Sequence, residues 1–134
     1  MGTDLIQLTG EDGNALEFNR RGGVGCISVS ANVAPKLCSD MQLAWREKDI
    51  QKAQKINLML AKLHNSLFLE SSPGPVKYAA SLLGLCTSET RLPLVEINEK
   101  TKKRFHGAPK TKIVFSCDAL YLTRPQKTLP EPEN

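Results

Sequence analysis

The sequence predicts an α/β fold that is mostly helical, with one repeat of strand, helix and strand at its N-terminal end. Short apolar runs separated by glycine-rich turns occupy residues 4–33, and apolar residues then recur every three or four positions up to about residue 70. With 134 residues, 40% of them hydrophobic and 24% charged, the chain has the size and composition of one ordinary globular domain.

Three short elements are predicted before residue 34. Residues 4–13 (DLIQLTGEDG) predict a brief strand and a turn, residues 14–23 (NALEFNRRGG) a short helix, and residues 24–33 (VGCISVSANV) a second strand. Either Asp12 or Asn14 is expected to cap the helix. Two strands separated by one helix at this spacing indicate a β/α repeat with parallel strands.

The glycine cluster of Gly22, Gly23 and Gly25 has two interpretations. A phosphate-binding loop would make the chain a nucleotide-binding domain. That loop follows a strand and opens a helix, whereas these glycines follow a predicted helix and lead into a strand. We therefore favour glycines that end the helix and allow close backbone approach at the start of the strand.

Residues 34–70 are predicted to be helical almost throughout, with a break near Lys48–Asp49 where Asp49 can cap a second helix. One apolar stripe runs along that second helix. Its expected role is core packing, and the alternative is a non-enzymatic helical interaction module that binds a partner through the stripe. The stripe consists of Ala53, Ile56, Leu60, Leu63 and Leu67.

Two further helices are predicted, over residues 76–83 and from residues 98–104 onward, with an extended segment between them. Pro73 and Pro75 are expected to exclude a helix where they stand. The run at 98–104 carries four cations against one anion and accounts for most of the net charge of +4. A solvated helix end explains this run more simply than a nucleic-acid-binding surface, so no nucleic-acid partner is expected.

The composition changes near residue 105. Residues 105–134 hold four of the eight prolines and show no sustained periodicity, so we expect a divergent, poorly ordered tail. The predicted organisation is therefore a strand-helix-strand portion over 1–35, a helical region over 36–104, and the tail.

The four cysteines form no metal-binding motif with each other or with the two histidines, so no metal site is expected. They are Cys26, Cys38, Cys86 and Cys117. Free thiols, an acidic N-terminal segment unlike a signal peptide, and the lack of a long apolar run predict a cytoplasmic protein without a membrane partner.

Small polar residues stand where the second predicted strand runs into its loop: Ser28, Ser30 and Asn32. In a β/α barrel the active site forms at the carboxyl ends of the strands. The same residues could simply cap the next helix, and composition alone does not separate the two roles.

Other catalytic arrangements are weakly supported. His64 lies within a predicted helix and is interpreted as a surface or interface residue rather than a member of a Ser-His-Asp triad. The adjacent carboxylates of Glu11 and Asp12 are expected to serve a loop or a cap. Lys77 stands in the first turn of a helix rather than at the end of a strand, so we interpret it as structural and not as a Schiff-base lysine.

Three ordered stretches carry more specific motifs: a G-E-D turn followed by G-G-x-G and I-S-V-x-A-N-V-x-P, then L-F-x-E with P-x-P-V-K-x-A, then RLPL at 91–94. Ser72 stands where the second motif usually has Asn. Together the stretches resemble the C-terminal portion of the 4-hydroxy-tetrahydrodipicolinate synthase (dihydrodipicolinate synthase) family, over about residues 4–104. The matching residues of the first two are Gly10, Glu11, Asp12, Gly22, Gly23, Gly25, Ile27, Ser28, Val29, Ala31, Asn32, Val33, Pro35, Leu67, Phe68, Glu70, Pro73, Pro75, Val76, Lys77 and Ala79.

This resemblance implies the C-terminal part of a TIM (β/α)8 barrel, its last strands, followed by a helical appendage. It implies a Schiff-base lyase that condenses pyruvate with aspartate semialdehyde in the diaminopimelate route of lysine biosynthesis, without a metal or diffusible cofactor, in a homotetramer. Of the family's pocket residues, only Ile27 carries over, through a backbone carbonyl that lines the pyruvate site.

The resemblance also implies that the Schiff-base lysine lies in a G-I-K-x-A segment upstream of the glycine cluster. The 134 residues contain no such segment. We therefore expect a fragment with no catalytic residue of its own and no activity alone. Its matching start and aperiodic ending suggest a reading-frame change near Phe105–His106.

Overall fold

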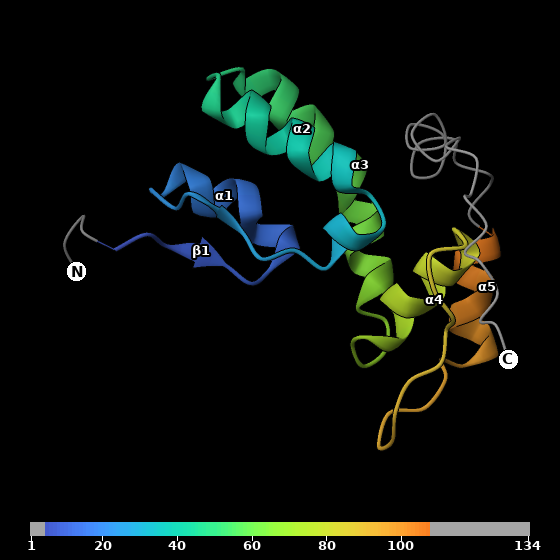
Figure 1. The fold of residues 1–134 in the computed structure, drawn as a ribbon. Helices are drawn as coiled ribbons and strands as arrows, with labels where there is room; N and C mark the ends of the chain where they lie inside the picture. Colours follow the sequence, from blue (N-terminus) through green and yellow to red (C-terminus); the bar gives the residue numbers. More distant parts are fainter. Residues whose placement is uncertain (1–4, 108–134) are drawn as a thin grey trace, which may run out of the picture.

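The computed structural model describes residues 5–107. Two strands and one short helix form its N-terminal part, and four longer helices follow (Figure 1). The elements are β1 (Leu8–Thr9), the 3-10 turn η1 (Asp12–Asn14), α1 (Ala15–Arg20), β2 (Gly25–Cys26), the 3-10 turn η2 (Ser30–Asn32), α2 (Pro35–Arg46), α3 (Ile50–Leu67), α4 (Gly74–Leu82) and α5 (Glu99–Gly107). From residue 108 onward, the expected tail lies outside the described residues, and α5 itself extends three residues beyond the predicted boundary at 104.

The two strands pair in parallel, as predicted, with Leu8 opposite Gly25 and Thr9 opposite Cys26. The second strand is much shorter than the predicted 24–33. The backbone after β2 turns into η2 at Ser30, because the Asp12 carboxylate, from the loop after β1, accepts hydrogen bonds from the Val29 and Ser30 N–H groups.

The glycine cluster ends α1 and allows close packing. Gly22 adopts a φ of 98°, and the Gly23 N–H donates to the Phe18 carbonyl at 3.0 Å, which closes the helix end. A Cβ on Gly23 would lie 2.1 Å from the Phe18 ring, so no side chain fits there without movement. Both glycines therefore have structural roles, which leaves the nucleotide-loop hypothesis without support from this segment.

The predicted break between the two long helices is confirmed. Lys48 takes the left-handed conformation, with a φ of 63°, and the Asp49 carboxylate accepts from the Lys52 N–H at 3.0 Å to cap α3. The two helices then run back along each other as a hairpin.

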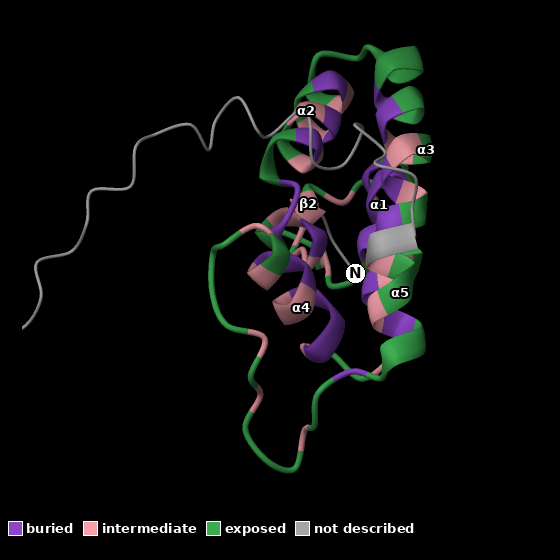
Figure 2. Cartoon of the chain, turned by 90° about the vertical axis from the view of Figure 1, so that its right-hand side faces the viewer, coloured by how far each residue is buried: buried purple, intermediate pink, exposed green. Residues whose placement is uncertain are grey.

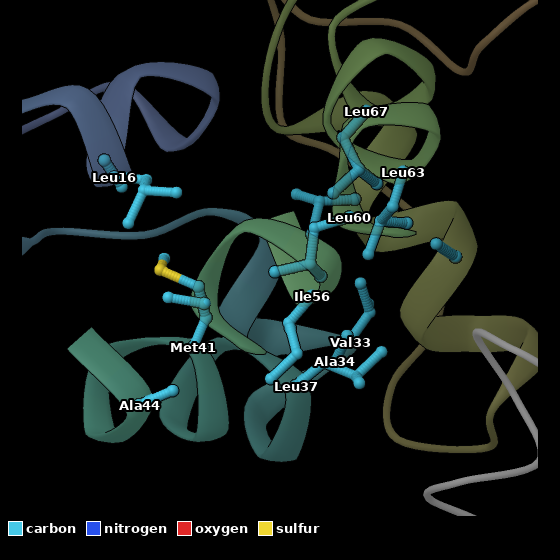
Figure 3. Close-up of a cluster of buried hydrophobic side chains, with 14 of the residues drawn as sticks. Leu16, Val33, Ala34, Leu37, Met41, Ala44, Ile56, Leu60, Leu63 and Leu67 are labelled. Carbon is cyan, nitrogen blue, oxygen red and sulfur yellow. The ribbon is translucent and has the colours of Figure 1, made fainter. Parts of the chain in front are cut away.

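The apolar stripe of α3 forms the centre of the hydrophobic core (Figure 3). All five stripe residues are buried, and α2 contributes Leu37, Met41 and Ala44 from the facing side. Burial follows these inner faces along the helices (Figure 2). Because the stripe is buried in the core of this chain, it offers no exposed apolar face of the kind that the hypothesis of a helical interaction module requires.

The helix predicted at 76–83 begins earlier, at Gly74. The expectation that Pro75 excludes a helix was wrong, because proline is compatible with a first helical turn, where its missing N–H needs no partner. Gly74 also packs closely: a Cβ there would lie 2.9 Å from the Ile97 side chain.

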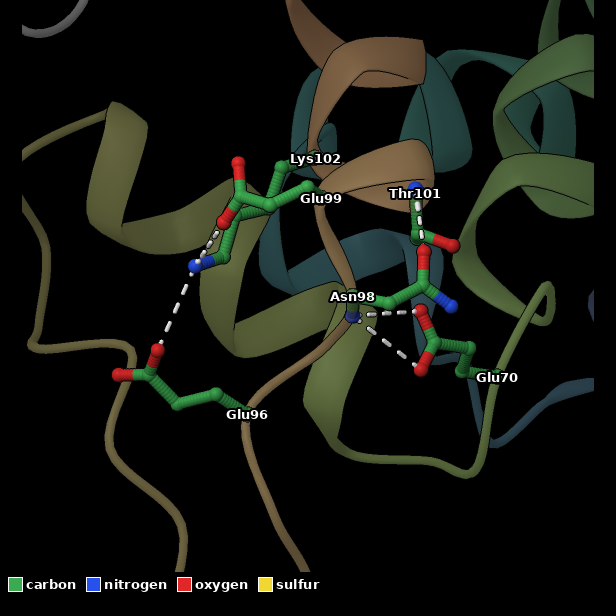
Figure 4. Close-up of polar contacts among 6 residues, drawn as sticks. All are labelled: Glu70, Glu96, Asn98, Glu99, Thr101 and Lys102. Atoms are coloured by element: carbon green, nitrogen blue, oxygen red, sulfur yellow. Dashed lines mark hydrogen bonds and ion pairs between the residues drawn. The ribbon is translucent and has the colours of Figure 1, made fainter.

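Hydrogen bonds and ion pairs, three of whose acceptors are carboxylates, stabilise the first turn of α5 (Figure 4). The Glu70 carboxylate accepts from the Asn98 N–H at 3.1 Å, and Asn98 Oδ1 in turn accepts from the Thr101 N–H at 2.8 Å, which caps the helix. On α5 itself, Lys102 pairs with Glu99 at 3.0 Å and with Glu96 at 3.4 Å. No helix in the described part of the chain is both long and apolar enough to cross a membrane.

Candidate functional site

Ile27 directly follows β2, at the edge where both parallel strands end. Its N–H donates to the Thr9 carbonyl at 2.8 Å, which ties it to the end of β1. The residue is 70% exposed, and its carbonyl accepts no hydrogen bond from another residue in 5–107. The carbonyl is thus a fixed acceptor without a protein partner in the described chain. The predicted role of Ile27 in binding pyruvate stays a prediction.

Asp12 joins the two strand ends and is the most connected polar residue of this edge. Its carboxylate, only 3% exposed, accepts from the Val29 N–H at 2.8 Å, the Ser30 N–H at 3.1 Å and the Ser28 hydroxyl. A buried carboxylate with several donors is well satisfied as an anion. The loop from Ile27 to Ser30 is therefore held by a residue of the other strand's loop.

The expected capping roles in this region were partly wrong. Asp12 does not cap α1, because its carboxylate is directed at the η2 backbone, and Asn14 makes no side-chain cap bond. Glu11 takes a loop role, as expected: its carboxylate accepts from the Gly13 N–H at 3.3 Å and caps η1.

The polar residues after β2 all have structural partners. Ser28 Oγ accepts from the Ala31 N–H at 2.8 Å, Asn32 Nδ2 donates to the Val29 carbonyl at 3.0 Å, and Ser30 is fully buried. The predicted capping of the next helix was wrong, because α2 begins at Pro35 without a side-chain cap. The contacts of these residues instead support the turn that follows the strand end.

His64 is buried, contrary to its interpretation as a surface or interface residue. It stands one position after Leu63 and four after Leu60, on the widened apolar face of α3, and its Nδ1 lies 2.7 Å from Ser30 Oγ. Burial lowers the pKa of His64 from its ordinary value, so the imidazole is neutral near pH 7. Its Nε2 has no partner among the described residues.

This arrangement is not a catalytic triad. In a triad the carboxylate bonds the histidine that activates the serine. Here Asp12 accepts from the Ser30 backbone N–H, while the Ser30 hydroxyl meets Nδ1 of His64. The three residues instead connect the β1 loop, η2 and α3 into one support.

A cavity of about 230 Å³ lies behind this support, lined in part by Asp12, Cys26, Cys38 and His64. Burial, with the nearby Asp12 carboxylate, raises the pKa of Cys26 to about 11, which keeps it a neutral thiol. Cys26, Cys38 and Cys86 form no disulfide bond among the described residues, and Cys117 lies outside them. Within residues 5–107, no cluster of His, Cys, Asp or Glu could hold a metal ion.

Comparison with known proteins identifies the family to which this chain belongs. The model of the dihydrodipicolinate synthetase family matches residues 1–112. The chain belongs to that family. The 4-hydroxy-tetrahydrodipicolinate synthase of Pelagibacter ubique is 61% identical over 105 residues, which cover 76% of this chain and 36% of the relative. The chain thus spans about a third of the length of this curated relative.

Solved dihydrodipicolinate synthases share the fold. A monomeric variant superposes with a TM-score of 0.79 at 33% identity, over 84% of this chain and 37% of that one. The enzyme from Acinetobacter baumannii, complexed with pyruvate, superposes with a TM-score of 0.74 at 40% identity, over 79% and 36%. These structures confirm the predicted fold class: this chain is the last strands of a TIM barrel with its helical appendage.

Sequence reasoning identified the synthase motifs but not the support beneath them. The sequence predicts a cap at Asp12 and a surface position for His64, because the partners of both side chains lie far away along the chain, at Ser28–Ser30. One local signal for His64 was available: its spacing from Leu60 and Leu67 puts it beside the buried stripe.

Proposed function

We propose that this chain forms the C-terminal part of a dihydrodipicolinate synthase, an enzyme that condenses pyruvate with aspartate semialdehyde in lysine biosynthesis. The observation that carries the proposal is the position of Ile27. Its carbonyl has no hydrogen-bond partner among residues 5–107 and stands at the common edge of two parallel strands, in a chain that the family model matches over residues 1–112. Barrel enzymes bind substrate at this edge.

In the proposed reaction, a lysine amine attacks the pyruvate ketone and water leaves, which gives an iminium. The iminium withdraws electrons, so the neighbouring methyl group loses a proton, and the resulting enamine attacks the aldehyde carbon. The resemblance places that lysine in a G-I-K-x-A segment, which the 134 residues do not contain. The role proposed for this chain is therefore binding: the Ile27 carbonyl forms one wall of the pyruvate pocket.

The support beneath Ile27 gives this role a physical basis. Asp12 fixes Val29 and Ser30 through their N–H groups, and the Ile27 N–H is fixed by Thr9. A carbonyl held from both sides can meet a substrate without reorganising. The pyruvate bound by the Acinetobacter baumannii relative supports this substrate.

The proposal is tested by trapping. The purified chain is incubated with pyruvate and borohydride, which reduces an iminium to a stable amine, and is then weighed by mass spectrometry. We expect no pyruvyl adduct on the chain alone and a stoichiometric adduct on a complete family member treated in parallel. A pyruvyl adduct on any lysine of the 134 residues would show that the chain carries its own Schiff-base residue and would overturn the proposal.

We also propose that the complete protein works in the cytoplasm as a homotetramer, as the resemblance implies. One solved family member is a monomeric variant, so assembly needs its own measurement. Sedimentation of the complete protein should give the mass of four copies.

A further inference from the structure

A basic groove lies between α3 and the start of α5, on residues that the synthase proposal does not use. Its volume is about 730 Å³. Four cations line it, Lys62 from α3 and Lys100, Lys103 and Arg104 from α5, together with Asn65 and Ser66. Among residues 5–107, no Asp or Glu contributes to the lining.

Helical spacing explains how the cations converge. Lys100, Lys103 and Arg104 stand at positions i, i+3 and i+4 and therefore share one face of α5. Lys62, Asn65 and Ser66 follow the same spacing on α3. Two helix faces, each with cations or polar groups, thus line one hollow.

The four cations of the basic groove have no acidic partners within residues 5–107. The two carboxylates that could have neutralised α5 locally, Glu96 and Glu99, both pair with Lys102 (Figure 4). Lys102 does not line the groove. Its pairing leaves Lys100, Lys103 and Arg104 without a counter-charge from their own helix.

We propose that the basic groove binds a small polyanion through a chain of phosphate groups. Like charges gathered in a hollow repel one another and raise the local potential, which an anion relieves. Lysine and arginine also donate several charge-assisted hydrogen bonds to phosphate oxygens, and the Asn65 amide can add a neutral one. The binding site needs only α3 and α5, so it is independent of the synthase proposal.

The lining favours a small polyanion over a nucleic acid. Proteins that bind single strands stack bases on aromatic side chains, and no aromatic residue of the described part of the chain lines the basic groove. Within the part of the chain that the structure describes, Leu69 is the one apolar residue that lines it. A hollow with cations on two sides surrounds a short phosphate chain, whereas duplex binding needs a basic surface that follows the backbone.

The test titrates the full chain with inorganic tripolyphosphate by calorimetry, at low and at high salt. We expect one binding event that weakens as salt rises. Lys62→Glu with Lys103→Glu should weaken it by about tenfold or more, because two charge-assisted contacts are reversed. The matched control, Lys52→Glu with Lys55→Glu, makes the same charge change on exposed α3 residues outside the groove and should leave the affinity within about twofold.

Two further arms decide the outcome. Lys62→Arg with Lys103→Arg keeps the charges and should keep the affinity, while circular dichroism verifies that every variant retains its helices. A nucleoside triphosphate should bind as inorganic tripolyphosphate does. No binding by the folded chain, equal losses in both charge-reversed variants, or tighter binding of an RNA duplex would each overturn the proposal.

Discussion

At the scale of single residues, Asp12 is the polar group on which the strand ends depend most. Its carboxylate accepts hydrogen bonds from Ser28, Val29 and Ser30, and the residue has almost no contact with water. The substitution Asp12→Asn removes the negative charge and also places an amide N–H₂ group against backbone N–H groups. Such a conflict leaves buried donors unsatisfied.

We predict that Asp12→Asn lowers the free energy of unfolding by about 2 kcal/mol. Urea unfolding, followed by circular dichroism, measures the change. Glu11→Gln is the matched control: Glu11 is exposed, and glutamine keeps the oxygen that caps η1, so stability should hardly change. Equal losses in both variants would contradict the assignment of Asp12 as the central acceptor.

The buried His64 predicts a pH dependence with a definite sign. In the unfolded chain its imidazole takes up a proton near its ordinary pKa of 6.5, whereas burial lowers the pKa in the folded chain. As pH falls below about 6.5, the unfolded state binds the proton first, so stability is lost. Above that pH, the neutral His64 makes its full contribution to the free energy of unfolding.

The urea concentration at the unfolding midpoint should therefore decrease as the pH is lowered from about 7.5 to about 5.5. His64→Asn keeps an acceptor near Ser30 and removes the titration, so its midpoint should change less over this range. The same slope in both proteins would show that other groups cause the loss.

The residue scale also shows why site prediction was incomplete. The prediction for Ile27 rests on a contiguous motif, and it stays a prediction. The role of Asp12 depends on Ser28, Val29 and Ser30, sixteen or more positions away, and no local pattern announces that contact. A carboxylate beside a turn has the same local signature whether it caps its own helix or crosses to another loop.

At the scale of elements, the helices could be predicted well and the strands poorly. The 3.6-residue period and the capping Asp49 are local signals, and the structure follows them closely in α2 and α3. The end of β2 depends on a partner from the β1 loop, so its shortening at Cys26 was invisible in the sequence. The prediction for Pro75 was wrong because proline disrupts the interior of a helix but is compatible with its first turn.

The turn between α2 and α3 offers a stabilising change. Lys48 stands at a φ of 63°, in the left-handed region that costs a non-glycine residue free energy. The Asp49 N–H donates to the Ala44 carbonyl at 2.9 Å and closes the end of α2, so the backbone there is fixed.

We predict that Lys48→Gly raises the free energy of unfolding by about 1 kcal/mol. Lys52→Gly, a lysine-to-glycine change inside α3, should lower it by about the same amount. The opposite signs distinguish a turn effect from the removal of a positive charge. Thermal unfolding of the two variants measures both, and a loss in Lys48→Gly would contradict the account.

At the scale of the whole molecule, the strand pair is an unfinished sheet within the described residues. β1 and β2 pair only with each other, and the apolar side chains around them are exposed: Ile6 is 84% exposed and Val24 60%. Strand edges and apolar faces of this kind are usually covered. In the family, neighbouring strands of a closed barrel provide that cover.

We predict that the chain alone associates through this sheet. Ile6→Lys should shift sedimentation toward the monomer, because a charge on the strand pair opposes pairing with another chain. Leu58→Lys is the control, since Leu58 is 73% exposed but stands on α3, away from the strands. Equal shifts would place the association elsewhere.

The most direct test of the account is complementation. The chain is mixed with the remaining N-terminal portion of the Pelagibacter ubique synthase, its 61% identical relative, and the condensation of pyruvate with aspartate semialdehyde is measured. We predict activity in the mixture and none in either part alone, with the trapped pyruvate on the N-terminal portion. Activity of the 134-residue chain by itself, or an inactive mixture in which the two parts form a stable complex, would contradict the account.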